Sequence, residues 1–221
     1  RLLLTDISNG CNDPVSNTVD VTVVNQPGVS VSVDNPLVCI GGSSVISSSI
    51  TNGSGIYTYQ WQSSPDGSSG WANITTGGNS STYNAPTSVA GTTYYRLVLS
   101  DLANGCADPV SNVVSVDVRM QPELTISVDN DLVCIGGVSL LTSTITNGSG
   151  VYLYQWQSSP DGSTWNNLSP NGNQATYTAV ATSAGTTYYR LLLTDLSNGC
   201  NDPESNVLSI TAEEQPTVNI T

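Results

Sequence analysis

The sequence repeats itself at an interval of about 95 residues. The segment at 59–68 reads YQWQSSPDGS, and the same ten letters recur at 154–163. The segment AGTTYYR likewise occurs at 90–96 and again at 184–190. A unit of this length is longer than a solenoid repeat and large enough to close a hydrophobic core of its own. The repeat therefore predicts separate domains in tandem.

The same comparison sets the expected domain boundaries. RLLLTDISNGCNDPVSN at 1–17 matches RLLLTDLSNGCNDPESN at 190–206. The start of the chain is therefore interpreted as the C-terminal strands of a preceding repeat, and the last residues as the first strand of a following one. On this interpretation the natural protein continues at both ends. The expected parts are a partial repeat, two whole immunoglobulin-like repeats and a second partial repeat, at 1–26, 27–121, 122–215 and 216–221.

Each repeat is predicted to consist of β-strands. Apolar and polar residues alternate at Val29–Val33 and Ile56–Gln62, and turn signals such as NGSG and SPDGS separate such segments. No segment shows a sustained period of 3.6 residues. Roughly seven short strands per repeat are typical of an all-β, immunoglobulin-like sandwich. Four aromatic residues are expected in its cores: Trp61, Trp156, Tyr95 and Tyr189.

The composition excludes several functions. The chain has 4 Lys+Arg against 17 Asp+Glu, a net charge of −13, and it contains no His. Such an acidic chain repels phosphate backbones and anionic lipids, so nucleic acid is not an expected partner. No run of 18 apolar residues occurs, so no membrane insertion is expected. Since Lys is also absent, the usual bases that activate a nucleophile are missing, and no catalytic residue is expected.

Five cysteines fall into two series with different neighbours. Cys39 and Cys134 precede a GG pair, whereas Cys11, Cys106 and Cys200 each follow the letters NG. Two cysteines per repeat, with no CxxC pair, indicate disulfides of an oxidising compartment and not a zinc site. The odd total is explained if Cys11 belongs to an incomplete repeat.

One pairing places the bonds within repeats, Cys39 with Cys106 and Cys134 with Cys200. The order Cys39, Trp61, Cys106 is similar to the Cys–Trp–Cys order of immunoglobulin domains. Both cysteines are displaced along their strands relative to that pattern, however, toward opposite poles of the sandwich. A strand of about eight residues spans roughly 26 Å, whereas a disulfide needs Cα atoms about 5.5 Å apart. This pairing therefore requires a departure from the standard topology.

The other pairing joins Cys39 to Cys200, across the boundary between repeats. In a head-to-tail array, the turn after the first strand of one repeat faces a hairpin of the next. This is the hairpin between the last two strands of the repeat, called F and G in immunoglobulin domains. Cys11, Cys106 and Cys134 would then bond to partners in further repeats. The sequence leaves both pairings open, and the spacing leans toward the bond between repeats.

Calcium is the one cofactor that the sequence makes worth weighing. Carboxylate oxygens suit Ca²⁺, but no DxDxDG loop occurs, and Asp in tight turns usually accepts hydrogen bonds from its own backbone. We therefore expect turn roles and no metal site. The calcium candidates flank the F–G hairpins: Asp101, Asp108, Asp195 and Asp202.

The segments VCIGG, YQWQSSPDG, TTYYRLVLSD and NGC–DPVSN together resemble the Ig-like or PKD-like tandem repeats of giant surface proteins of the Bacteroidetes. The resemblance covers the whole chain. It implies an extracellular, cell-surface location and roles in adhesion, gliding or fibres. It brings no catalytic residues.

The function expected from the sequence is a structural stalk or fibre segment that holds an adhesive or functional tip away from the cell and is stiffened by disulfides. The expected partners are neighbouring repeats of the same chain, with lateral self-association as a further option. One alternative is a glycan-binding adhesive module that uses Trp71 or Trp165. Another is a spacer in a large secreted polysaccharide-degrading enzyme.

Overall fold

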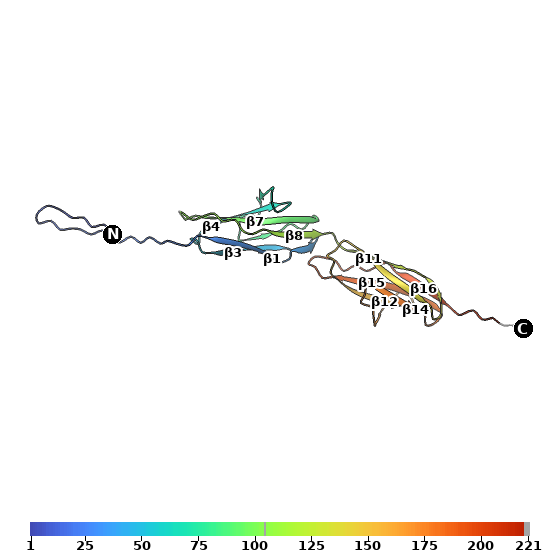
Figure 1. The fold of residues 1–221 in the computed structure, drawn as a ribbon. Coiled ribbons are helices and arrows are strands. Elements are labelled where there is room, and N and C mark those ends of the chain that lie inside the picture. The colour runs from blue at the N-terminus through green and yellow to red at the C-terminus, as the bar shows by residue number, and fades with distance from the viewer. Residues whose placement is uncertain (104, 219–221) are drawn as a thin grey trace.

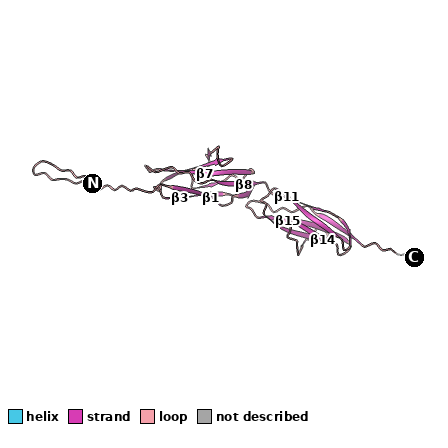
Figure 2. Cartoon of the chain, viewed as in Figure 1, coloured by secondary structure: helices cyan, strands magenta, loops and turns pink. Residues whose placement is uncertain are grey.

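Two β-sandwiches lie end to end in the computed structural model, which describes residues 1–103 and 105–218 (Figure 1). The two termini extend from opposite ends of the pair. Strands and loops account for all the described residues (Figure 2), and none of these residues belongs to a helix that could span a membrane. The expected all-β class and the tandem immunoglobulin-like repeats are confirmed.

The first sandwich consists of a three-stranded and a five-stranded sheet, with orders β1-β3-β6 and β2-β8-β7-β4-β5. Its strands are β1 (Gly28–Val33), β2 (Leu37–Cys39), β3 (Val45–Thr51), β4 (Tyr57–Ser64), β5 (Ala72–Asn73), β6 (Thr82–Asn84), β7 (Gly91–Asp101) and β8 (Val114–Arg119).

The second sandwich has the same arrangement, with orders β9-β11-β14 and β10-β16-β15-β12-β13. Its strands are β9 (Glu123–Val128), β10 (Leu132–Cys134), β11 (Val138–Thr146), β12 (Tyr152–Ser159), β13 (Asn166–Asn167), β14 (Thr176–Val180), β15 (Gly185–Asp195) and β16 (Leu208–Glu213).

The first strand of each repeat is divided between the two sheets. In the first repeat β1 pairs antiparallel with β3, and the chain then crosses to the other sheet, where β2 pairs parallel with β8. The parallel register places Cys39 opposite Arg119, the last residue of β8. This pairing carries Cys39 to the pole of the sandwich at which the chain leaves for the second repeat.

A tryptophan lies at the centre of each core. The side chains of Trp61 and Trp156 are fully buried, and each indole N–H donates to a backbone carbonyl, of Ser80 and Gln174 respectively. These bonds satisfy a donor that would otherwise be buried without a partner. Tyr95 and Tyr189, also expected in the core, are buried against the same clusters.

Residues 1–26 form no sandwich. Their only β-bridge within the described residues joins Leu3 to Val15, and it closes a hairpin around Cys11 that stands in solvent. In the second repeat, the strands that match residues 1–26 are β15 and β16, which pair with β12 and β10. Within the described residues, no strand pairs with residues 1–26 in this way. Of the predicted strand at 216–221, residues 216–218 have no regular structure and residues 219–221 lie outside the described residues.

Truncation of a core tryptophan tests this description of the fold. Trp156→Ala removes a fully buried side chain, so we expect the free energy of unfolding of the second sandwich to fall by about 3–5 kcal/mol in guanidinium titrations. Val89 is 76% exposed, so Val89→Ala should change the free energy of unfolding by less than about 0.5 kcal/mol. Equal effects of the two substitutions would contradict the assigned core.

Candidate functional site at the joint between the repeats

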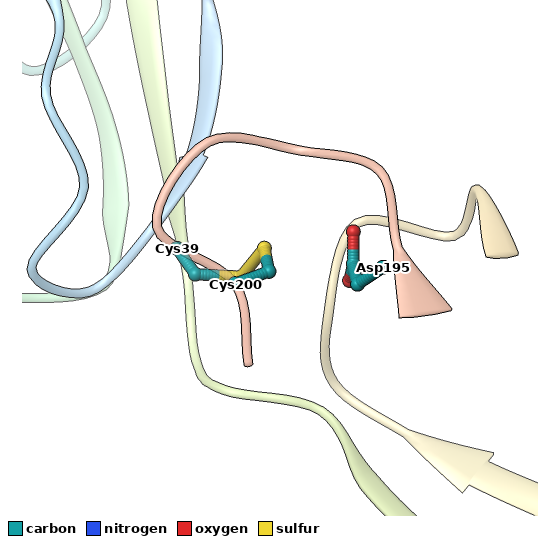
Figure 3. A group of neighbouring side chains, drawn as sticks. All are labelled: Cys39, Asp195 and Cys200. Atoms are coloured by element: carbon teal, nitrogen blue, oxygen red, sulfur yellow. A yellow bond between two sulfur atoms is a disulfide. The ribbon is translucent and has the colours of Figure 1, made fainter. Parts of the chain in front are cut away.

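The joint is formed by two turns from different repeats. The first turn follows β2 and reads Cys39-Ile40-Gly41-Gly42. The second is the hairpin between β15 and β16, which carries Asn198, Gly199 and Cys200. Figure 3 shows this hairpin lying against the end of the first sandwich.

A disulfide crosses the joint. Cys39 and Cys200 are bonded, with their Cα atoms 4.8 Å apart and a sequence separation of 161 residues (Figure 3). This is the pairing between repeats that the sequence left open. Within the described residues, Cys11, Cys106 and Cys134 carry free thiols. Cys106 follows β7 at the pole opposite Cys39, so the two strand displacements seen in the sequence do separate these sulfurs.

Two glycines allow the backbones to meet. Gly199 has a φ of +75°, and a Cβ added to it would lie 2.2 Å from the Cα of Gly42. In the other direction, a Cβ on Gly42 would lie 2.7 Å from the carbonyl oxygen of Asn198. Heavy atoms cannot approach so closely, so only glycine fits at either position.

Asn198 makes the principal hydrogen bonds across the joint. Its carbonyl accepts from the N–H of Cys39 at 3.0 Å, and its side-chain oxygen accepts from the N–H of Ser43 at 2.8 Å. Val38 and Asn198 also form a parallel β-bridge. The hairpin of the second repeat thus adds to the sheet edge of the first at its pole.

Gln121, the residue between the two sandwiches, bonds to both. Its side-chain amide nitrogen donates to the carbonyls of Ile40 and Gly199, each at 2.8 Å, and its side-chain oxygen accepts from the N–H of Asn201 at 2.8 Å. A linker side chain with three bonds to two domains restricts their relative rotation. Nothing in the composition of a Gln-Pro linker indicates this role, although the pair recurs at 26, 121 and 215.

The four aspartates named as calcium candidates accept hydrogen bonds at the F–G hairpins, which connect β7 to β8 and β15 to β16. Asp101 accepts from the N–H and hydroxyl of Ser54 and from the N–H of Ala103, while Asp108 accepts from the N–H of Asp101. Asp195 and Asp202 repeat this pattern in the second sandwich. The hairpin sequence around Asp101 includes residue 104, which lies outside the described residues.

One group of three potential metal ligands lies close together within residues 1–103 and 105–218: Cys39, Asp195 and Cys200 (Figure 3). Two of its three ligand atoms are the sulfurs of the disulfide, so they are not thiolates that could bind a metal. The four aspartates weighed for calcium contribute only Asp195 to this group.

The two tryptophans named for glycan binding, Trp71 and Trp165, are half-buried and stacked on arginines. The guanidinium carbons of Arg96 and Arg190 lie 4.2 and 4.3 Å from the ring centres of Trp71 and Trp165. Arg190 also pairs with Glu204 at 2.6 Å. One face of each indole is therefore covered by a cation of its own domain.

A family model described as a domain of unknown function (DUF8696) matches twice, over residues 29–120 and 123–214. No curated protein matches the chain.

Solved structures with similar folds include titin domains A168–A170, at 14% identity and a TM-score of 0.48, covering 84% of this chain and 66% of that one. Three N-terminal domains of the bacteriophage RB49 Highly Immunogenic Outer Capsid protein match at 13% identity and a TM-score of 0.47, covering 84% of this chain. The match spans 59% of the length of that phage chain.

Acid should destabilise the first sandwich through Asp101. Burial raises the pKa of this carboxyl, but hydrogen bonds from Ser54 and Ala103 lower it by more, so its pKa in the folded protein lies below the usual 3.8. The stability that this group contributes is therefore complete above about pH 3.8 and is lost as the pH falls through the folded-state pKa. Asp101→Asn should lower the Tm at pH 7 by several degrees and flatten its decline below pH 4. Asp20→Asn, in the exposed N-terminal segment, is the control, and an equal change there would contradict this role.

The glycine contact predicts a matched pair of variants. Gly199→Ala and Gly10→Ala both place a side chain at a left-handed φ, but only the first creates a clash, because nothing lies within 4 Å of a Cβ at Gly10. Gly199→Ala should therefore reduce Cys39–Cys200 disulfide formation in a glutathione buffer by more than tenfold, measured by peptide mapping without reduction. Gly10→Ala should leave it unchanged. Full disulfide formation in Gly199→Ala would show that the close contact is not required.

Proposed function

We propose that this chain, which belongs to the DUF8696 family of domains of unknown function, is a spacer segment of an extracellular protein. In this role its immunoglobulin-like domains are held in line by disulfides between neighbours. The proposal rests chiefly on one observation: the disulfide joins residues 161 positions apart in two different domains. Each domain has a tryptophan-centred core of its own, so this bond is not needed to close either core. Its main effect is on how the two domains are oriented.

The disulfide changes the path of tension through the chain. When the two ends are pulled, force enters along residues 1–39, crosses the sulfur–sulfur bond to Cys200 and leaves along residues 200–221. Residues 40–199, which include most of both sandwiches, are bypassed. At roughly 3.4 Å per residue, the bypass withholds about 550 Å of extended chain. A segment of this kind keeps its length under load, as a stalk or fibre must.

The joint also supports a stiff spacer in the absence of tension. Only Met120, Gln121 and Pro122 separate β8 from β9, and Gln121 bonds to both domains. A flexible linker would instead be longer and rich in Gly and Ser. The disulfide favours an extracellular site, since such bonds persist in oxidising compartments.

The role of spacer requires no catalytic residue and no cofactor, and its partners are neighbouring domains of the same kind. The same role is compatible with a stalk that carries an adhesive tip and with a large secreted enzyme. Glycan binding through Trp71 or Trp165 is less favoured, because Arg96 and Arg190 already cover one face of these rings.

Single-molecule force spectroscopy tests the proposal. The oxidised chain, pulled from its ends, should extend by about 550 Å less than the reduced chain. Cys39→Ser should behave as the reduced chain even in oxidising buffer, and Cys106→Ser should behave as the wild type. Equal extension of oxidised and reduced chains would contradict a role in bearing tension.

A further inference from the structure

The turn half of the observed joint occurs a second time in this chain, and the hairpin half occurs at two further places. One of these, ANGCADP at 103–109, differs in two letters from the docked hairpin, and its Gly105 carbonyl and Ala107 N–H are already bonded to the side chain of Gln26. The other copies match letter for letter. The turn that receives the hairpin, Val38–Gly42, reads VCIGG, and the same letters recur at Val133–Gly137. The hairpin that enters the joint reads SNGCNDP at Ser197–Pro203, and the same seven letters recur at Ser8–Pro14. The second copies are not joined to each other within the chain, and both of their cysteines, Cys134 and Cys11, are exposed.

The free hairpin already has the shape of the docked one. The N–H of Leu4 donates to the carbonyl of Pro14 at 3.1 Å, as that of Leu193 does to Pro203 at 3.1 Å. The φ of Gly10 is +86°, close to the +75° of Gly199.

Two hydrogen bonds inside the free hairpin also match. The N–H of Asp6 donates to Asp13 and that of Ser8 to Asp6, and the docked hairpin makes both of these bonds at Asp195–Asp202 and Ser197–Asp195.

The free turn is equally preformed. The N–H of Gly137 donates to the carbonyl of Cys134 at 2.8 Å, as that of Gly42 does to Cys39 at 2.9 Å. The φ of Gly136 is +88°, against +89° for Gly41.

The linker glutamine is in place as well. The side chain of Gln215 donates to the carbonyl of Ile135 at 2.9 Å, which reproduces the bond from Gln121 to Ile40. In the observed joint, Gln121 also bonds to the docked hairpin, at Gly199 and Asn201. In the free half-joint the corresponding partners would be Gly10 and Asn12.

We propose that the turn around Cys134 is a docking site for the hairpin Ser8–Pro14 of a second copy of this chain, and that the two copies become linked head to tail by a Cys134–Cys11 disulfide. The hairpin and the turn each already have, before docking, backbone hydrogen bonds that match those in the observed joint, so docking requires less reorganisation than it would for unformed segments. The contact is heterologous, so a linked pair of these chains keeps one undocked turn and one undocked hairpin, to which further copies can add.

Bond formation requires an oxidant, for which oxidised glutathione is sufficient. The thiolate of Cys11 attacks a sulfur of glutathione disulfide, forms a mixed disulfide and releases one glutathione thiolate. The thiolate of Cys134 then attacks the Cys11 sulfur, forms the new disulfide and releases the second glutathione. Two protein thiols are oxidised and one glutathione disulfide is reduced to two thiols.

The experiment uses the full chain with its Cys39–Cys200 bond intact, incubated at high micromolar concentration with oxidised and reduced glutathione. Disulfide-linked species are separated by electrophoresis without reduction, and their linked peptides are identified by mass spectrometry. We expect Cys11–Cys134 to be the main bond between chains, at least tenfold more abundant than Cys11–Cys11, Cys134–Cys134 or any bond to Cys106.

Variants that leave every thiol in place separate docking from random oxidation. Gly10→Ala should reduce the Cys11–Cys134 product more than tenfold, because the counterpart of Gly10 touches the backbone of Gly42. Asn9→Ala should reduce it about threefold to tenfold, since the side chain of its counterpart Asn198 accepts a hydrogen bond across the joint. Asn12→Ala should have no effect, because its counterpart Asn201 bonds in the joint through its backbone N–H.

Three results would overturn the proposal: a mixture of pairings with no preference, a Cys11–Cys134 yield unaffected by Gly10→Ala, or no bond between chains. None of them would affect the proposed spacer function, which rests on the disulfide within the chain. Conversely, equal extension of oxidised and reduced chains under force would leave docking between copies intact.

Discussion

The joint depends on the approach of two glycine backbones, and its other features follow from that approach. Because neither Gly42 nor Gly199 has a Cβ, the hairpin of one repeat can lie directly on the turn of the other. At that distance Asn198 accepts hydrogen bonds from the N–H groups of Cys39 and Ser43, and the Cα atoms of the two cysteines lie 4.8 Å apart. A side chain at either glycine would move both the hydrogen bonds and the sulfurs out of range. The disulfide therefore secures a contact that the backbone first makes possible.

The same constraint accounts for which segments differ between repeats and which do not. VCIGG and the NGC hairpins lie at the poles, where each must fit a neighbouring domain. In the loop after the SPDG turn, SSG at 68–70 stands opposite ST at 163–164. Arg190 pairs with Glu204, while the corresponding position in the first repeat is Val110. Differences are tolerated where a residue contacts only its own domain. At the poles the letters VCIGG and NGC are the same in both repeats, and where the hairpins differ, at Ala107 and Asn201, the bond to the linker glutamine is made by the backbone N–H.

The sequence predicted the repeats, the all-β class and the core tryptophans, because internal repetition and alternation of period two report directly on these features. It left the disulfide pairing open, because the position of Cys39 depends on the short parallel pairing of β2 with β8. Three residues are too few to show a periodic pattern, and nothing local indicates that the first strand changes sheets. The stacking of Arg96 on Trp71 was likewise not predictable, since it depends on the register between β4, β5 and β7.

Because each sandwich has its own core, the joint governs mechanics more than folding. A disulfide that closed a loop within one domain would act mainly on the unfolded chain. Here the bond connects two domains that each bury a tryptophan and its surrounding cluster without it. Its consequences are a fixed relative orientation and a path for tension that bypasses residues 40–199, which hold most of both cores. Without the bond, the two domains would therefore be able to change their relative orientation while both cores stay folded. If the chain were then pulled, the tension would also pass through residues 40–199.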